Sequence, residues 1–182
     1  VDVNDGVRYV VDSEDPTEEK LLQKAFVTEA SAELKKWEGL LPDDHSPSSG
    51  EWQSLISQAK IFKYAGFGRL LSRVSPLHVS PLNLSSVQLV VCNDKVTVEA
   101  AQRAQSNLDN QKTGVQMQLE NVYNTALLLS IRGAKSVVIN MHSISIESAQ
   151  EFQKQLLRKF LVSKTAATVL NEWRWRAMEE NN

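Results

Sequence analysis

Apolar side chains recur every three or four residues along much of this chain, and this spacing constrains the fold more than any other feature. Over residues 16–41 the series is Leu22, Phe26, Ala30, Leu34, Trp37 and Leu41. Such spacing places apolar side chains on one face of an amphipathic helix. Asp15, Pro16 and Glu18 favour a helix start, because aspartate caps, proline fits the first helical position and glutamate completes a capping box.

A second helix is predicted from residue 52 to residue 70. Ser48 and Glu51 form another capping box before it. Its apolar positions are Trp52, Leu55, Ile56, Ala59, Phe62 and Leu70. Gly66 and Gly68 predict a kink or a break near residues 65–68. The first two helices are expected to form an antiparallel hairpin.

Three further helices are predicted in the C-terminal half. The first covers residues 99–110, which are rich in helix-forming residues. In the competing interpretation, residues 95–98 instead form a strand that returns alongside residues 87–92. The second starts at a capping box, Thr113 to Gln116, and ends at Gly133. Its apolar face is expected to hold Val115, Leu119, Val122, Ala126 and Leu127. The third runs from Ile146, with an inner face of Ala149, Phe152, Leu156, Phe160, Ala167, Leu170 and Trp173.

The segments that the sequence predicts as β-strands are short. Residues 87–92 form the best strand candidate, and residues 136–140 form a second that could pair with it. Residues 7–11 could be a strand or an ordered arm, and residues 75–86 are expected to be an extended connection. The predicted fold class is therefore mainly α: a helical bundle-like domain of about five helices with at most a small two-stranded β element. A chain of 182 residues has the length of a single domain, which we expect to cover residues 1–182. If the chain divides into two parts, we expect the division near residues 75–86.

Cys92 is the only cysteine, and it lies in an apolar run. No internal disulfide can form, which favours an intracellular, reducing compartment such as cytoplasm or nucleus. The expected role of Cys92 is that of a small buried apolar residue. The sequence contains no run of about 18 apolar residues, so membrane insertion is not expected.

No motif in the sequence indicates an enzyme, a metal site or a cofactor site. His45, His78 and His142 lie in predicted loops or element ends, without the spacing of metal ligands. Residues 65–69 are glycine-rich but belong to a helical pattern, which indicates close helix packing more than phosphate binding.

The segment Trp173-Arg174-Trp175-Arg176 predicts a partner interface. Two residues along a helix are about 200° apart, so Trp175 leaves the inner face that Trp173 continues. An exposed tryptophan flanked by Arg174 and Arg176 is typical of an interface. Covering the end of the bundle is the alternative role for Trp175.

Basic residues form the second candidate surface. No acid lies between Glu51 and Asp94, whereas residues 1–44 carry twelve acids and five bases. A positive groove that contacts a polyanion would use Lys60, Lys63, Arg69, Arg73, Arg158 and Lys159. This groove requires the second and last long helices to lie side by side. Pairing of the same bases with the acidic N-terminal segment is the alternative.

Three functions follow as hypotheses. The first is a non-catalytic interaction or assembly module that self-associates or binds a protein partner through amphipathic helices. The second is a single-stranded RNA-binding structural protein, similar in role to a viral nucleocapsid or coat protein, although the net charge of −2 counts against it. The third is an enzyme whose site is assembled from scattered residues, for which the sequence offers no nucleophile–base pair.

Overall fold

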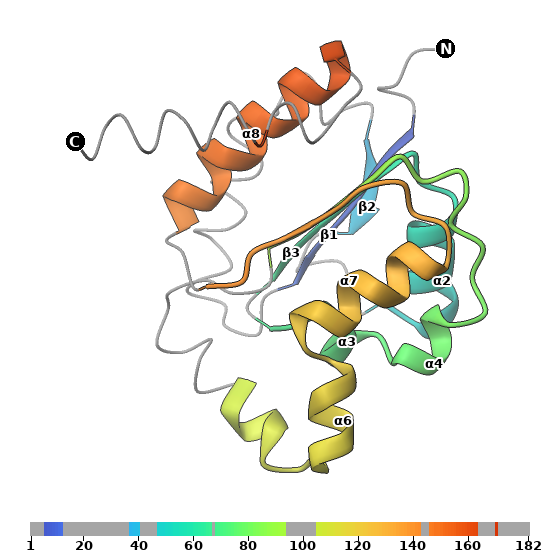
Figure 1. The fold of residues 1–182 in the computed structure, drawn as a ribbon, viewed down its shortest axis with the longest axis vertical. Helices are drawn as coiled ribbons and strands as arrows, with labels where there is room; N and C mark the ends of the chain where they lie inside the picture. The colour runs from blue at the N-terminus through green and yellow to red at the C-terminus, as the bar shows by residue number, and fades with distance from the viewer. Residues whose placement is uncertain are drawn as a thin grey trace.

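The centre of the protein is a five-stranded, entirely parallel β-sheet, seen edge-on between helices in Figure 1. A computed structural model describes residues 6–12, 37–40, 47–66, 68–93, 105–142, 146–163 and 170. The strands lie in the order β2-β1-β3-β4-β5. Their bounds are β1 Val7–Asp12, β2 Glu38–Leu40, β3 Ile61–Gly66, β4 Leu89–Asn93 and β5 Val137–Ile139.

The prediction of a mainly helical bundle is therefore wrong, because the fold is α/β. The strands β1, β3 and β4 have buried residues on both faces, so apolar residues stand at neighbouring positions, interrupted by Arg8 and Lys63, instead of in the alternation that identifies a half-exposed strand. A short run of this kind cannot be distinguished from a helix segment by its spacing. Residues 61–66 are the clearest case, since all six are buried.

One face of the sheet packs against α2, α3, α4 and α7. These helices are α2 Ser49–Ser57, α3 Leu70–Arg73, α4 Pro76–Val79 and α7 Val122–Ile131. Alternate strand residues such as Val10, Phe62 and Val90 belong to one apolar cluster with Ile56 of α2 and Leu129 of α7. This cluster is the larger part of the core.

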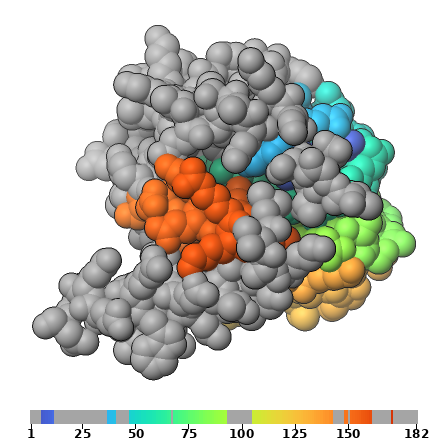
Figure 2. Space-filling model, turned by 90° about the horizontal axis from the view of Figure 1, so that it is seen from above, coloured from blue at the N-terminus to red at the C-terminus, as the bar shows by residue number. Residues whose placement is uncertain are grey.

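The opposite face packs against α8, Ile146–Ser163. Leu156, Leu157 and Phe160 of α8 form a second apolar cluster with strand residues that include Ile61 and Val91. The sheet is thus the middle of three layers. In the view from above, the orange surface of α8 lies on one side and the green and amber segments of the other layer lie opposite (Figure 2).

Several predicted helix boundaries are also wrong. Residues 38–40 are strand β2, so no helix extends to residue 41, and the rest of the first predicted helix lies outside the described residues. The second helix ends at Ser57 instead of residue 70, because the chain then enters β3. The predicted hairpin would need residues of the first helix that lie outside the described residues. Within the connection expected to be extended, residues 76–79 form α4, which Pro76 begins and the Ser75 side chain caps.

Local signals predicted other elements correctly. Two of the three predicted capping boxes are present, with Ser48 and Thr113 accepting hydrogen bonds from the backbone N–H groups of Glu51 and Gln116. The third, at Asp15 and Glu18, lies outside the described residues. Strands β4 and β5 pair as expected. Residues 7–12 form a strand, and α8 starts at the predicted residue with Ala149, Leu156 and Phe160 buried.

Gly133 ends the segment that contains α7, as the sequence predicts. Its φ of +109° is a conformation that other residues rarely adopt, and a Cβ there would lie 3.0 Å from the backbone nitrogen of Ser85. Glycine is therefore required by both the turn and the close approach of the two chain segments.

Candidate functional site

Exposed apolar side chains on two consecutive helices, α6 (Gly114–Leu119) and α7, form the most distinctive part of the described surface. Val115, Leu119, Tyr123, Leu127 and Ile131 follow one another at four-residue intervals and expose 67, 48, 69, 56 and 67% of their surface. We call these five residues the α6–α7 stripe. Single exposed apolar residues are ordinary, but contiguous ones mark an interaction surface.

Two helix caps create the stripe by dividing what the sequence predicts as one helix. The chain leaves α6 at Glu120, and Asn121 then caps α7 by accepting a hydrogen bond of 2.8 Å from the backbone N–H of Asn124. Figure 1 shows α6 and α7 as consecutive helices that meet at an angle. The change of direction separates α6 from the sheet, so no residue of α6 is buried.

The buried side of α7 determines which of its residues face outward. Thr125 and Leu129, four residues apart, are almost fully buried, and Leu129 belongs to the main apolar cluster. Tyr123, Leu127 and Ile131 are offset from them by two residues, which is about 200° around a helix. These three side chains therefore face away from the core.

The predicted apolar face of this segment is wrong. Val115, Leu119 and Leu127 were expected on one inner face, yet all three are exposed. The break at Glu120 and Asn121 resets the helical phase. In addition, α7 is apolar around most of its circumference, so its spacing cannot identify the side that packs against the sheet.

The stripe lacks charged neighbours in its own segment. Between Thr113 and Ile131 the only acidic or basic residue is Glu120, and its side chain is 8% exposed. Depletion of charged residues together with exposed aromatic and aliphatic side chains is typical of the core of a protein–protein interface.

An ion network holds Glu120 at the junction of the two helices. Arg69, which follows β3, donates from Nη1 to Oδ2 of Asp109 and from Nη2 to Oε2 of Glu120, at 3.0 Å each. Lys112 donates from Nζ to the same oxygen of Glu120 at 2.8 Å. Two cations therefore neutralise two carboxylates in a partly buried setting, and they connect α6 to the carboxyl end of β3.

Gln105 completes this network from the helical residues 105–109. Its Oε1 accepts a hydrogen bond of 3.1 Å from the backbone N–H of Arg69, and its Nε2 donates to Oδ1 of Asp109 at 2.8 Å. A Cβ on Gly68 would lie 2.6 Å from the same Oε1, so a larger residue there would push the Gln105 side chain away from this hydrogen bond.

The network changes the proton affinity of its members. Burial alone would raise the pKa of Asp109, but hydrogen bonds from Arg69 and Gln105 and the charges of Arg69 and Lys112 outweigh it and lower the pKa below its ordinary value of 3.8. Burial opposes the charge of Arg69, yet its two carboxylate partners raise the pKa of the guanidinium overall. Both groups are thus held in their charged forms.

Stability should therefore depend on pH through Asp109. Because its pKa is lower in the folded chain than in the unfolded chain, the unfolded state binds more protons as pH falls from about 5 to about 3, and the free energy of unfolding decreases. We expect the stability difference between the wild type and Asp109→Asn to be present at pH 7 and to shrink below about pH 4. Urea unfolding of both proteins at a series of pH values measures it. A difference that stays constant to pH 3 would contradict an ion pair at Asp109.

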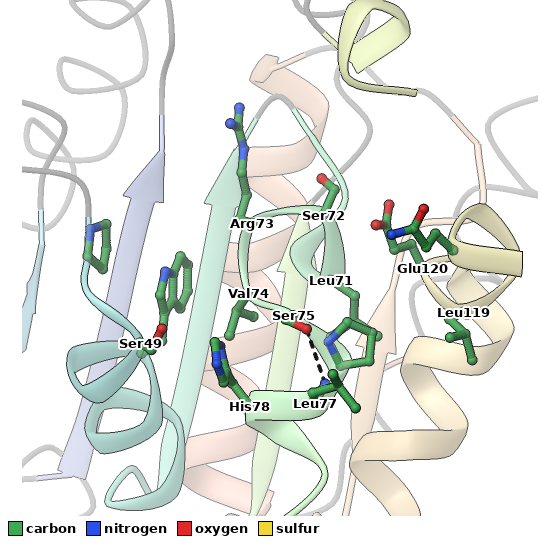
Figure 3. Close-up of a pocket in the computed structure, with 14 residues that line it drawn as sticks. Ser49, Leu71, Ser72, Arg73, Val74, Ser75, Leu77, His78, Leu119 and Glu120 are labelled. Atoms are coloured by element: carbon green, nitrogen blue, oxygen red, sulfur yellow. Dashed lines mark hydrogen bonds between the residues drawn. The ribbon is translucent and has the colours of Figure 1, made fainter. Parts of the chain in front are cut away.

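A cavity of about 520 Å³ adjoins the stripe between α2, α3, α4 and α6. Leu119 of the stripe lies at one side of it with Glu120, and Arg73 and His78 lie across from them (Figure 3). Leu77, which exposes 79% of its surface, is also part of the lining. The cavity thus extends the apolar surface from α6 toward α4, with polar side chains around it.

The six predicted polyanion contacts do not share one surface. Lys63 is buried in β3, and Arg69 is bound to two carboxylates. Arg73 lines the cavity on the α2 side of the sheet, whereas Arg158 and Lys159 lie on α8. The helices α2 and α8 lie on opposite faces of the sheet instead of side by side (Figure 1). Lys60 immediately precedes β3 and is half-buried.

Other candidate residues are dispersed or lie outside the described residues. Trp175, Arg174, Arg176 and His45 belong to the latter group. Cys92 is buried in the main cluster, as the sequence predicts. Within the described ranges, no group of three histidine, cysteine or acidic side chains could hold a metal ion. None of the helices in those ranges combines the length and apolar character needed to cross a membrane.

No direct signal for the α6–α7 stripe is present in the sequence. The one available indication is the excess of apolar residues in α7 over the number that a single buried face requires.

Comparison with known proteins does not add a functional assignment to this surface: no protein-family model matches the chain, and a search of curated proteins returns no match.

Proposed function

We propose that this chain is a non-catalytic assembly module that self-associates through the α6–α7 stripe. The observation that carries the proposal is the exposure of five apolar side chains on two consecutive helices, within a segment whose only charged side chain is buried. Water-exposed apolar area of this kind favours association, because its burial is driven by the hydrophobic effect.

A second copy of the chain is the partner that the charge pattern favours. In a twofold contact between identical surfaces, a charged side chain near the axis faces the same charge on the second copy. The stripe avoids this repulsion, since Gln116, Gln118 and Asn124 are the polar residues beside it. Amide side chains both donate and accept hydrogen bonds, so they can pair with their own copies.

The expected affinity is modest. Five side chains that expose about half to two thirds of their surface supply on the order of 500 Å² per copy, or about 1,000 Å² per dimer. This area is at the lower end for specific interfaces, which corresponds to a dissociation constant of roughly 10–100 µM. Association should therefore be visible only in concentrated samples.

Replacing Leu127 with glutamate should weaken self-association by at least about tenfold, because the contact would then bury an unpaired carboxylate. Sedimentation velocity from about 5 to 500 µM measures the change, since the lower end lies below the expected dissociation constant. Thermal unfolding should be nearly unchanged, as Leu127 is exposed.

Arg158→Glu is the matched control, because Arg158 is exposed on α8 in the opposite layer and its replacement also adds negative charge. This variant should associate like the wild type. A wild type that remains monomeric throughout the concentration range would overturn the proposed function. Equal weakening by both variants would show that charge, and not the stripe, governs association.

A further inference from the structure

Helix α6 has little apolar packing to hold it on the domain. None of its residues is buried, and Val115, Met117 and Leu119 expose 67, 39 and 48% of their surface. A Cβ on Gly114 would meet no atom within 4 Å outside the helix itself, so the first turn of α6 stands clear of the other described residues. Figure 1 shows α6 at the lower edge of the molecule, next to α7. The hydrophobic effect therefore contributes little to the position of α6.

Charged side chains attach the end of α6 instead. Among residues 111–121, all of which the structure describes, Glu120 is the one that is buried, and it directly follows α6. Its Oε2 accepts hydrogen bonds from Nη2 of Arg69 at 3.0 Å and from Nζ of Lys112 at 2.8 Å. A buried carboxylate needs such partners, because burial without them is costly. The two cations therefore determine where the end of α6 lies.

Arg69 and Lys112 differ in what they connect to Glu120. Lys112 lies two residues before α6, so its bond links the two ends of the same short segment. Arg69 lies three residues after the end of β3. Its backbone N–H and Nη1 are also bound to Gln105 and Asp109, at 3.1 and 3.0 Å. Of the two cations, only Arg69 thus connects α6 to the end of a sheet strand.

We infer that Arg69 is a positioning residue for self-association: through Glu120 it holds α6 where Val115 and Leu119 take part in the contact. The inference rests on the proposed function and adds to it a residue outside the contact, since the Arg69 side chain is 17% exposed. Helix α6 supplies two of the five apolar side chains of the α6–α7 stripe. A contact formed by α7 alone would bury only about 600 Å² per dimer, which is below the area of specific interfaces.

Loss of Arg69 should release α6 because it leaves a carboxylate without a cation. Glu120 and Asp109 then share Lys112, and water solvates the second carboxylate better than the partly buried junction does. Opening of α6 exposes Glu120 to water and removes this cost. If about one third of the copies keep α6 in place, the dissociation constant of the dimer rises about tenfold, because both copies must be competent.

Sedimentation velocity on Arg69→Met measures this effect. We expect self-association to be weaker than that of the wild type by at least about tenfold, although the residues of the stripe are unchanged. Arg69→Lys should recover part of the association, to within about threefold of the wild type, because lysine keeps the charge but not the forked contact. Recovery by charge is not expected of a residue that only fills space.

Leu156→Ala is the control for a general loss of stability. Leu156 is 0% exposed in α8, in the layer on the opposite face of the sheet. Its truncation should lower the urea midpoint of unfolding, yet association should stay within about twofold of the wild type. Equal weakening of association by Leu156→Ala and Arg69→Met would overturn the inference, since any destabilising change would then act in the same way.

Amide hydrogen exchange locates the change in the monomer. At about 5 µM, below the expected dissociation constant, peptides covering residues 114–120 should exchange at least about threefold faster in Arg69→Met than in the wild type. The same peptides should be unchanged in Leu156→Ala, because local opening of α6 does not depend on global unfolding. Unchanged exchange of α6 in Arg69→Met would overturn the inference.

Glu120→Ala tests the same attachment from the other side. It removes the carboxylate that Arg69 holds and leaves Arg69 paired with Asp109, so no carboxylate loses its cation and the variant should fold. Association should again weaken by at least about threefold. If Arg69→Met does not fold, association of Glu120→Ala at the wild-type level would overturn the inference.

These outcomes separate the inference from the proposed function. Association of the wild type that depends on Leu127, but not on Arg69 or Glu120, would overturn the role of Arg69 alone. Absence of association in the wild type at every concentration would overturn the proposed function, and the role of Arg69 with it.

Discussion

Replacing Phe62 with alanine is expected to lower the free energy of unfolding by about 3–5 kcal/mol. Phe62 lies in β3, between β1 and β4, and its side chain is 0% exposed. The substitution removes most of a buried ring from the larger apolar cluster and leaves a cavity, because the hydrogen-bonded strands on both sides restrict relaxation. Urea unfolding at neutral pH measures the loss.

Leu77→Ala is the control for this prediction. It also truncates an apolar side chain to alanine, but at a residue that is 79% exposed. Its effect should stay within about 0.5 kcal/mol. A loss below about 1 kcal/mol for Phe62→Ala would contradict a tightly packed core at this face of the sheet.

Replacing Arg69 with methionine is expected to destabilise the protein by about 2–4 kcal/mol, slightly less than for a fully buried ion pair. The change keeps much of the side-chain volume but leaves Asp109 and Glu120 with one cation fewer at about 3 Å. The carboxylates then repel each other in a setting that is largely shielded from water. Urea unfolding again provides the measurement.

A second substitution separates charge from packing in this network. Adding Glu120→Gln to Arg69→Met removes one of the two stranded carboxylates, so the double variant should be more stable than the sum of the single losses by on the order of 1–2 kcal/mol. Strict additivity would show that Arg69 and Glu120 do not interact in solution. Lys112 keeps a neutral acceptor in the double variant, which limits the remaining cost.

Elements with a strong local signal could be predicted from the sequence. Helix α8 has one apolar face, and residues such as Ala149 and Leu156 on it are buried as expected. The caps at Ser48 and Thr113 act over three residues, so the sequence alone determines them. The positive φ of Gly133 follows from the same kind of local requirement.

The parallel sheet could not be predicted because its strands pair over long distances along the chain. Strand β3 continues the spacing of α2 almost without interruption, as Ala59 and Phe62 follow Ile56 at three-residue intervals. Only the pairing of β3 with β1 and β4 makes residues 61–66 a strand. Tertiary context overrides local preference here.

The candidate surface was missed for a related reason. Leu127 and Leu129 are equally apolar, and the sequence does not show which of them faces the sheet. The structure resolves this question because α7 packs with Leu129 in the main cluster and leaves Leu127 outside. Exposure is a property of the packed molecule and not of the residue type.

The short outer strands of the described sheet affect which assemblies are possible. β2 and β5 have three residues each, whereas β1 and β3 have six. A strand of three residues presents few open backbone groups to another chain. Edge-to-edge pairing with a second sheet, which leads to fibrils, is therefore disfavoured. Backbone pairing at the edges of the described sheet is therefore a poor route by which copies of this fold could associate.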